Sequence, residues 1–245
     1  MTPTNPAGGP TSFVLVHGAY HGGWCWSRVR DLLQDRGHRV YTPSQTGCGD
    51  RAHLLDERIT IDTFVEDITA LILAEELHHV VLVGHSFGTR TVVGVADRIP
   101  NQLSHLVFLD GGFPTPGQSR LEVMTPAQRE ARIKSAQESS GGISIPPPAP
   151  EAFGLSDPDD IAWVQRRLTP QPFGTDTSPQ KLSHEIGNGL PCTYVRCIEP
   201  EFDGVGTAAD YAQQRQDWSY LTITGGHDAM VSNPRAVANL LESLA

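Results

Sequence analysis

The chain has 245 residues, a hydrophobic fraction of 38% and a formal net charge of −10. This length suits one large α/β domain, or one domain that carries an insertion. An acidic chain without a basic run binds nucleic acid poorly and is not attracted to anionic membranes. No apolar run approaches the roughly 20 residues that a membrane-spanning helix needs. We therefore expect neither nucleic acid nor a membrane as a partner.

The cysteines and the N-terminal segment bear on the cellular compartment. None of the four cysteines belongs to a C-x-x-C pair, and an even number does not imply disulfides at this length. Reduced thiols in the cytoplasm are the simplest interpretation. The segment Met1–Pro10 lacks the charged and then apolar pattern of a signal peptide. The sequence therefore predicts a cytoplasmic protein and leaves open whether it is a monomer or a homodimer.

The first third of the chain alternates short apolar runs with helical patterns. A buried strand is predicted over 12–16, and it leads into a glycine-rich loop over 17–24. A helix over 24–34, a strand over 38–42 and a helix over 59–77 follow. Strands that alternate with helices in this way predict a parallel sheet with right-handed crossover connections.

The next apolar run begins at Val80 and ends in Gly84-His85-Ser86-Phe87-Gly88, and a helix is predicted over 89–99. This pattern is typical of the G-x-S-x-G nucleophile elbow, where a serine sits on a strained turn between a strand and a helix. The glycines have a physical reason, because a side chain two residues from the serine would collide where helix and strand pack closely. Ser86 is therefore the candidate nucleophile, and the alternative is a surface serine in a tight turn.

After a further predicted strand over 103–109 the regular pattern stops. Proline and glycine recur from Phe113 to Leu190, and the run Pro146-Pro147-Pro148 cannot be helix or central strand. Helices are expected at 126–139 and 158–168, and no strand is expected in this length. We interpret residues 113–190 as a cap that lines a substrate pocket and excludes water.

The sheet pattern resumes behind this segment. The remaining predicted elements are a strand over 192–198, a helix around 207–216, a strand over 219–224 and a final helix over 235–244. Residues 1–112 and 191–245 therefore form the core, and residues 113–190 form the cap.

A serine hydroxyl is a weak nucleophile, so it needs a base and a carboxylate that orients the base. Of the ten histidines, His227 follows the last predicted strand in the loop Gly225-Gly226-His227-Asp228. The chain order of serine, acid and histidine in this architecture requires such a late histidine. His227 is therefore the candidate base, while His17 and His21 are expected to shape the loop after the first strand.

Two carboxylates satisfy the same chain order. Asp110 closes the strand after Ser86, follows four apolar residues and precedes two glycines, which suits a rigid, partly buried acid. Glu199 follows the next strand among more polar neighbours, and Glu201 and Asp203 are weaker versions of that alternative. We favour Asp110 and keep Glu199 open.

The glycine-rich loop after the first strand predicts an oxyanion hole. In serine hydrolases of this architecture one donor comes from this loop and the other from the residue after the serine. The amides of Ala19, or alternatively Tyr20, and of Phe87 occupy those places. The alternative is a plain connection from strand to helix.

Together these motifs resemble the α/β-hydrolases, in particular the plant methylesterase and hydroxynitrile lyase group and its bacterial esterase relatives. Residues 13–24 resemble the plant methylesterase opening, 46–54 and 167–172 resemble bacterial members, and 225–228 resemble the histidine loop of the family. The resemblance spans almost the whole chain. It implies an α/β-hydrolase fold with a mostly parallel sheet, helices on both faces and a cap inserted after the sixth strand. It also implies a core without the first strands of larger relatives, and no cofactor.

The sequence departs from parts of that group. Hydroxynitrile lyases have His-Thr in the oxyanion loop and lysine after the catalytic histidine, where this chain has Gly18 and Asp228, so cyanohydrin cleavage is not expected. Plant members take their acid from a position where this chain has Pro200 or Glu199, depending on the alignment. Haloalkane dehalogenases place it where Asp110 stands, but their nucleophile is an aspartate.

We therefore predict a cofactor-independent carboxylic ester hydrolase that cleaves a small, largely apolar ester or lactone through an acyl-enzyme. Its catalytic residues are Ser86, Asp110 and His227, and no histidine spacing supports a metal site. Two alternatives stay open. One is a non-hydrolytic receptor that keeps the triad residues on the same fold. The other is a cofactor-free lyase or isomerase that uses His227 as a base without acylating Ser86.

Overall fold

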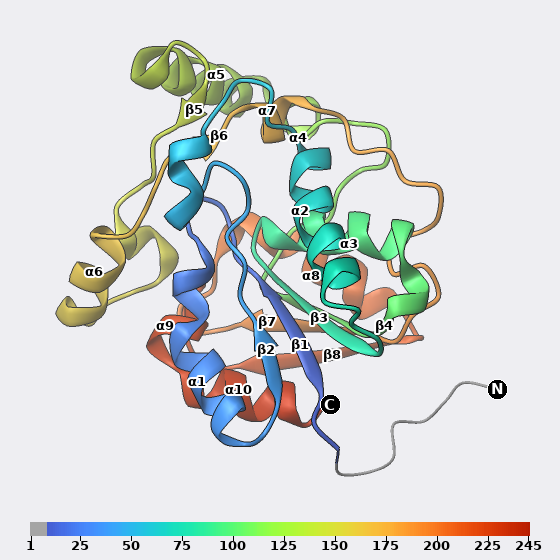
Figure 1. The fold of residues 1–245 in the computed structure, drawn as a ribbon. Coiled ribbons are helices and arrows are strands. Elements are labelled where there is room, and N and C mark those ends of the chain that lie inside the picture. The colour runs from blue at the N-terminus through green and yellow to red at the C-terminus, as the bar shows by residue number, and fades with distance from the viewer. Residues whose placement is uncertain (1–8) are drawn as a thin grey trace.

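Six parallel strands form the central sheet of the computed structural model, which describes residues 9–245 (Figure 1). The strands are β1 (Ser12–Val16), β2 (Arg39–Tyr41), β3 (Val80–His85), β4 (Leu103–Leu109), β7 (Cys192–Cys197) and β8 (Trp218–Ile223). Their order across the sheet is β2-β1-β3-β4-β7-β8. Neighbouring strands pair in parallel, with Val83 of β3 opposite Val107 of β4. The predicted α/β architecture with a parallel sheet is confirmed.

The strand order reverses next to β1. The chain passes from β1 outward to β2 and then crosses back to β3, which pairs with the other side of β1. In open α/β sheets ligands bind outside the carboxyl ends of the strands at such a reversal. The loop after β1 and the turn after β3 both start at this place.

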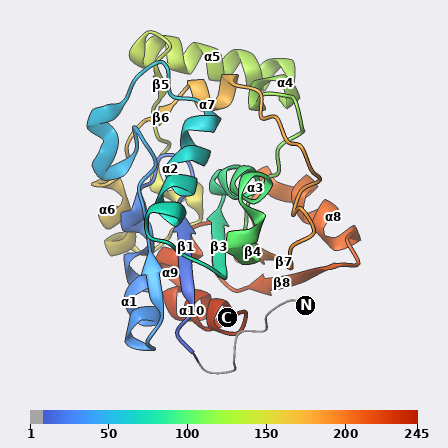
Figure 2. The same ribbon diagram turned by 45° about the vertical axis from the view of Figure 1, so that its right-hand side comes forward.

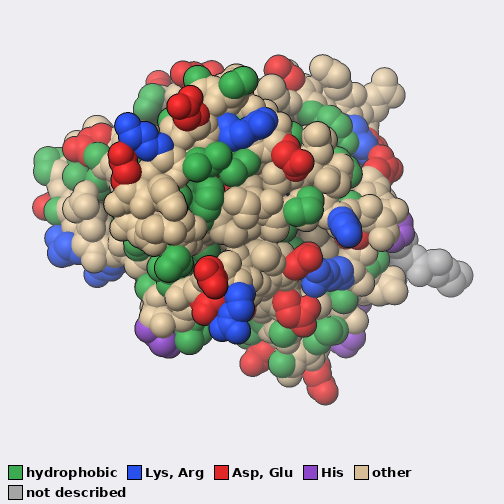
Figure 3. Space-filling view, turned by 90° about the horizontal axis from the view of Figure 1, so that it is seen from above, with side chains coloured by type: hydrophobic (Ala, Val, Ile, Leu, Met, Phe, Trp, Pro, Cys, Tyr) green, Lys and Arg blue, Asp and Glu red, His purple; other side chains and the backbone are tan. Residues whose placement is uncertain are grey.

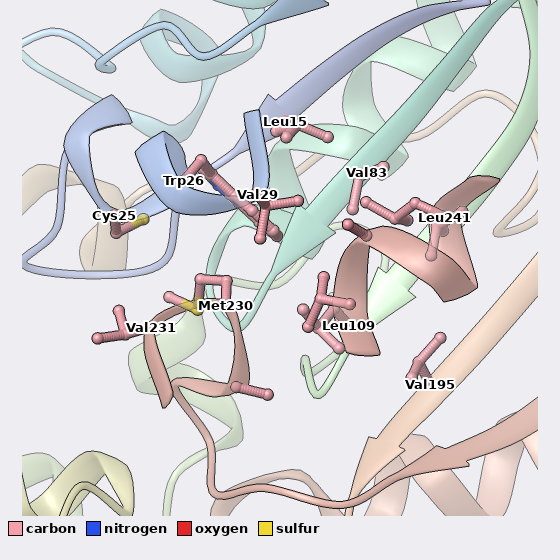
Figure 4. Close-up of a cluster of buried hydrophobic side chains, with 14 of the residues drawn as sticks. Leu15, Cys25, Trp26, Val29, Val83, Leu109, Val195, Met230, Val231 and Leu241 are labelled. Carbon is pink, nitrogen blue, oxygen red and sulfur yellow. The ribbon is translucent and has the colours of Figure 1, made fainter. Parts of the chain in front are cut away.

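Helices cover both faces of the sheet (Figures 1 and 2). One face packs against α1 (Ser27–Asp35), α9 (Ala229–Ser232) and α10 (Pro234–Glu242), and the other against α2 (Ile61–Ala74), α3 (Gly88–Arg98) and α8 (Gly206–Gln214). The strand residues alternate between the two cores: Leu15 and Val83 face α1 and α10, whereas Val14 and Leu82 face α2 and α3. Figure 4 shows the first core around Val29 and Leu241. Burial on both faces explains why these strands are continuous apolar runs.

All seven predicted helices are present, with ends that lie within three residues of the predicted ones. The helix expected over 24–34 begins instead with a 3₁₀ turn at Gly23–Trp26, and α1 starts only at Ser27. Trp26, fully buried in the core, ends that turn. The start of α2 at Ile61 follows a capping box between Thr60 and Thr63, which satisfies backbone donors that a helix start leaves free.

Segment 113–190 connects β4 to β7 and lies over the carboxyl ends of the strands (Figure 2). It contains α4 (Arg120–Val123), α5 (Pro126–Ser140), β5 (Ser144–Ile145), α6 (Pro158–Gln165), β6 (Gln171–Pro172) and α7 (Gly174–Thr177). The expectation that this length holds no strand is wrong, because β5 and β6 pair antiparallel. Strands of two residues are too short to show the alternation by which a strand is recognised in a sequence.

The last part of segment 113–190 runs along the outside of α3 rather than over the strands. Gln180 donates a hydrogen bond to the carbonyl of Arg90 at 2.7 Å, and Asp97 accepts the backbone N–H groups of Ser183 and His184. The sheet holds six strands, and segment 113–190 comes after the fourth of them in the chain. The insertion expected after the sixth strand therefore follows the fourth strand of this chain, whose core was expected to lack the first strands of larger relatives.

Two further observations concern the chain as a whole. Residues 1–8, which form most of the segment where the sequence shows no signal-peptide pattern, lie outside the described part. Among the helices of residues 9–245, none has both the length and the apolar character to cross a membrane.

Candidate active site

Ser86 lies on a sharp turn between β3 and α3. Its φ of +53° is in the left-handed region, which is costly for a residue with a side chain. A Cβ atom at Gly84 would lie 2.7 Å from a methyl carbon of Val92, and one at Gly88 would lie 2.6 Å from the carbonyl oxygen of His17. The two glycines of the motif are therefore required by close packing, as the sequence predicts.

The structure brings Ser86, His227 and Asp110 into one hydrogen-bonded line. Nε2 of His227 lies 2.8 Å from Oγ of Ser86, and Nδ1 lies 2.7 Å from a carboxylate oxygen of Asp110. Asp110 is fully buried, and its second oxygen accepts the backbone N–H of Cys197 at 3.2 Å. Arg196 adds a longer contact of 3.5 Å to the same oxygen. This arrangement can remove a proton from a serine hydroxyl and hold the histidine in one tautomer.

The other candidate acids lie elsewhere. The side chain of Glu199 is exposed and forms no hydrogen bond within residues 9–245, while its backbone N–H donates to the carbonyl of Gly225 at 3.1 Å. Glu201 pairs with Arg196 at 3.4 Å, and Asp203 is exposed. The described structure thus gives His227 one carboxylate partner within hydrogen-bond distance, Asp110.

The backbone next to Ser86 offers two free donors. Within residues 9–245, the amides of Ala19 and Phe87 donate to no protein acceptor, and both residues line the cavity that contains Ser86. The amide of Tyr20, the alternative donor, is taken by the side chain of Gln171 at 3.2 Å. A Cβ atom at Gly18 would lie 2.8 Å from that of Ser86, so a larger residue there would fill the space beside the serine.

A buried ion pair that the sequence does not predict stands directly behind these donors. His21 donates through Nδ1 to the carbonyl of Ala19 at 2.8 Å and through Nε2 to Asp228 at 2.9 Å. Two donated hydrogen bonds require the charged imidazolium form. The pair links the loop after β1 to the residue that follows His227. The two partners are 207 positions apart, so no spacing in the sequence could have revealed the contact.

The pKa values of the pair follow from burial and mutual attraction. Burial lowers the pKa of His21, but the charge of Asp228 and the two hydrogen bonds outweigh burial and raise it overall. Burial raises the pKa of Asp228, and His21 more than compensates, so the net shift is downward. Both shifts therefore favour the charged forms of the two groups. By contrast, burial lowers the pKa of His17 to about 4 and keeps it neutral.

A cavity of about 970 Å³ opens above Ser86. Phe202 lies against the ring of His227 with 4.0 Å between ring centroids, and Phe153 lies 6.4 Å from it. About half of the remaining lining comes from segment 113–190, including Met124 and Ile145. The cavity is therefore apolar near the histidine. In residues 9–245 no group of three or more His, Cys, Asp or Glu side chains could hold a metal ion.

Comparison with known proteins identifies the class. Residues 13–240 match the family described as "Alpha/beta hydrolase family", and the chain belongs to this family. The resemblance found in the sequence and the predicted fold class are both confirmed.

Individual relatives agree at the level of enzyme class. A carbendazim hydrolyzing esterase from Nocardioides sp. (strain SG-4G) is 35% identical over 95% of this chain and 99% of its own length. Methylesterase 1 of Arabidopsis thaliana is 38% identical over 76% of this chain and 77% of its own. The solved structure of an extracellular α/β-hydrolase from a Paenibacillus species has a TM-score of 0.80 at 22% identity, covering 96% and 98% of the two chains. The expectation of an enzyme of the carboxylic ester hydrolase class is confirmed.

Proposed function

We propose that the protein hydrolyses a small carboxylic ester or lactone through an acyl-enzyme formed on Ser86. The observation that carries this proposal is the line of Asp110, His227 and Ser86, with 2.7 and 2.8 Å between successive polar atoms, at the floor of a cavity. Sequence relatives that are named esterases support the same reaction class.

The proposed reaction begins with proton transfer. Nε2 of His227 takes the proton of Ser86 while Oγ bonds to the ester carbonyl carbon, and Asp110 stabilises the imidazolium that forms. The amides of Ala19 and Phe87 donate to the developing oxyanion, a contribution of about 3 kcal/mol per donor in comparable sites. His227 then gives its proton to the leaving alcohol as the carbon–oxygen bond breaks. A water molecule, activated by His227, releases the acid by the reverse steps.

Segment 113–190 is proposed to be the cap of this enzyme, on a core of residues 1–112 and 191–245. Its backbone docks onto the loop after β1, because Thr169 donates to the carbonyl of Tyr20 at 2.9 Å. The backbone N–H of Asp228 donates to Phe153 at 3.0 Å on the other side of the cavity. These contacts fix the segment to both loops that carry the proposed machinery, so that it encloses the substrate and reduces access of water. The cytoplasmic location stays a prediction.

The test is replacement of the nucleophile. Ser86→Ala is expected to abolish hydrolysis of a panel of p-nitrophenyl esters, and a fluorophosphonate is expected to label wild type but not this variant by intact mass. Activity that survives Ser86→Ala would refute the acyl-enzyme mechanism. A wild-type protein that binds small esters but takes up no label would favour the non-hydrolytic receptor. Product formation without a trappable acyl-enzyme would favour a lyase or isomerase.

A further inference from the structure

Three arginines line one side of the cavity above Ser86: Arg90 of α3, Arg120 of α4 and Arg132 of α5. Arg120 and Arg132 share a single, fully buried carboxylate, Asp176, at 3.2 and 2.7 Å. Arg132 also donates to the hydroxyl of Tyr20 at 2.8 Å. Three positive charges therefore face one negative charge. Asp176 lies behind the cavity wall, and the carboxylate that lines the cavity itself, Asp203, is exposed and comes shortly before α8.

Within the described part of the chain, Arg90 is the member of this cluster whose guanidinium has no hydrogen-bond or ion-pair partner. Its side chain is buried, with 5% of the residue exposed, and its Nε and Nη2 atoms have no hydrogen-bond acceptor among residues 9–245. Burial and the neighbouring Arg120 lower its pKa to about 10, so it is still charged at neutral pH. A guanidinium carries five N–H donors, and a buried charge without acceptors is costly for the folded state.

The ring of Phe87 does not replace the missing acceptors. The guanidinium carbons of Arg90 and Arg120 lie 5.8 and 5.9 Å from its centroid, a distance at which a cation and a ring attract weakly. Such an attraction satisfies no N–H group. Phe87 directly follows the nucleophile and offers one of the two free amides, so the unpaired charge is adjacent to the place where the acyl group would bind.

The face of the protein seen from above carries charges of both signs, unlike the arginine side of the cavity (Figure 3). Seen from above, Lys and Arg side chains are interspersed with Asp and Glu over the surface (Figure 3). The protein as a whole is acidic, with a net charge of −10. An excess of arginine inside an acidic protein favours anionic ligands there, because a desolvated guanidinium binds a carboxylate through paired, charge-assisted hydrogen bonds.

We propose that Arg90, with Arg120 beside it, binds a carboxylate in the acyl part of the substrate, so that the enzyme prefers half-esters of dicarboxylic acids. This inference rests on the proposed function, because the acyl part is defined by attachment to Ser86. The leaving alcohol takes its proton from His227, where Phe153 and Phe202 form apolar walls. The alcohol part is therefore apolar, and the charged group lies on the Phe87 side.

Matched pairs of methyl esters test the inference. Monomethyl succinate, glutarate and adipate are compared with methyl 4-methylpentanoate, 5-methylhexanoate and 6-methylheptanoate, in which an isopropyl group replaces the carboxylate. The ratio of kcat/KM values, charged over neutral, is expected to exceed ten for at least one pair in wild type. Arg90→Met is expected to lower that ratio about 10- to 100-fold, and Arg90→Lys to lower it less. Arg39→Met, at the opposite, exposed end of β2, removes the same charge and is expected to keep the ratio.

Binding without turnover separates this inference from the proposed function. Calorimetric titration of Ser86→Ala with the same half-esters is expected to show binding that the added Arg90→Met change weakens at least tenfold. Ser86-dependent hydrolysis with a preference for the neutral esters would overturn the carboxylate site and leave the proposed function intact. If half-esters bind in an Arg90-dependent way but wild type does not hydrolyse them, the carboxylate site would stand and the proposed function would be overturned. The melting temperature of Arg90→Met is expected to equal or exceed that of wild type, and a clear decrease would identify Arg90 as structural instead.

Discussion

The two sides of the active-site cavity are built differently. We call the floor the carboxyl ends of β1, β3 and β4 with the loops that carry Ser86 and Asp110, together with α3. In α3 nine of 11 residues are buried. We call the roof the part of segment 113–190 that lies over these strand ends. It contains α5, where one of 15 residues, Ala136, is buried. The floor is held by two large apolar cores, one on each face of the sheet, whereas the roof combines a small apolar cluster around Ala136 with polar bonds such as that between Arg132 and Asp176.

Backbone strain marks the floor, although the turn before β3, at the opposite end of the strands, holds two further non-glycine residues with positive φ. Tyr20, Ser86 and Asp110 have φ values of +69°, +53° and +45°, and they follow β1, β3 and β4. Each such conformation costs about 1–3 kcal/mol and persists only where the surroundings determine the chain path. Within segment 113–190, Asn188 shares this conformation, and it lies beside α3 rather than in the roof. We infer that the rigid floor carries the chemistry, and that substrate recognition is divided between Arg90 of α3 on the floor and side chains of the roof such as Arg120.

The largest effect is expected from the acid on the floor. Asp110→Asn should lower kcat by about 10³- to 10⁴-fold, because the amide no longer stabilises the tautomer and the imidazolium that His227 needs. Glu199→Gln, a matched change at the neighbouring strand end, should alter kcat less than about twofold, since that side chain is exposed. Steady-state kinetics on one p-nitrophenyl ester measure both. The opposite ranking would transfer the role of the acid to Glu199.

The ion pair behind the floor gives the next largest effect. Asp228→Asn should lower the free energy of unfolding by about 3 kcal/mol, because it leaves His21 buried without its counter-charge. Since the pKa of His21 is raised and that of Asp228 lowered, the pair stabilises fully between about pH 4 and pH 6.5. Its contribution is lost as pH rises through the raised pKa of His21, or falls through the lowered pKa of Asp228.

Urea unfolding of wild type and Asp228→Asn at pH 6 and at higher pH measures this dependence. The difference between the two proteins should be larger at pH 6 and shrink as the pH increases. Asp217→Asn removes a carboxylate from an exposed pair with Arg215 and serves as the control, because solvent screens such pairs. A difference that grows with pH would contradict the charged state assigned to His21.

The floor was predictable from the sequence because its signals are local. The elbow around Ser86 is a run of five residues, Asp110 ends an apolar strand, and His227 follows the last one. Parallel topology then brings strand ends to one edge, so the order of elements is enough to gather these side chains. Which carboxylate reaches His227 depends on side-chain direction, and the sequence could only favour Asp110 over Glu199.

The roof and the buried charges were not predictable in the same way. The strands β5 and β6 have two residues each, and their pairing joins positions with no periodic pattern between them. The contacts of Asp176 with Arg120 and Arg132 depend on how irregular turns fold back over the sheet. Nothing in the neighbours of Arg90 along the chain indicates that it lacks an acceptor. These features arise from packing between distant segments, which a single sequence does not encode locally.

A smaller effect is expected from a glycine of the floor. Gly88→Ala should lower the free energy of unfolding by about 2 kcal/mol, because the added Cβ would lie 2.6 Å from the carbonyl oxygen of His17 and neither backbone can move freely. Gly112→Ala is the stability control, since a Cβ there meets nothing within 4 Å. Thermal and urea unfolding measure both variants. Equal stability of the two would show that the turn after Ser86 can relax, against the rigidity assigned to the floor.

The smallest effect compares the same cap chemistry in the two regions. Thr60 begins α2 on the floor side, and Thr125 begins α5 in the roof, each in a capping box with the residue three positions later. Replacing either threonine by alanine should cost about 1 kcal/mol of helix stability.

The two variants are expected to differ in which measurement reports the loss of helix stability. Thr60→Ala should lower the global free energy of unfolding in urea, because α2 unfolds together with the sheet. Thr125→Ala should chiefly reduce hydrogen-exchange protection within α5, because a helix with one buried residue can open while the floor stays folded. If Thr125→Ala lowers the global value as much as Thr60→Ala, roof and floor unfold as one cooperative unit. Substitutions in the roof would then also lower the stability of the floor that holds Ser86, Asp110 and His227, the proposed triad.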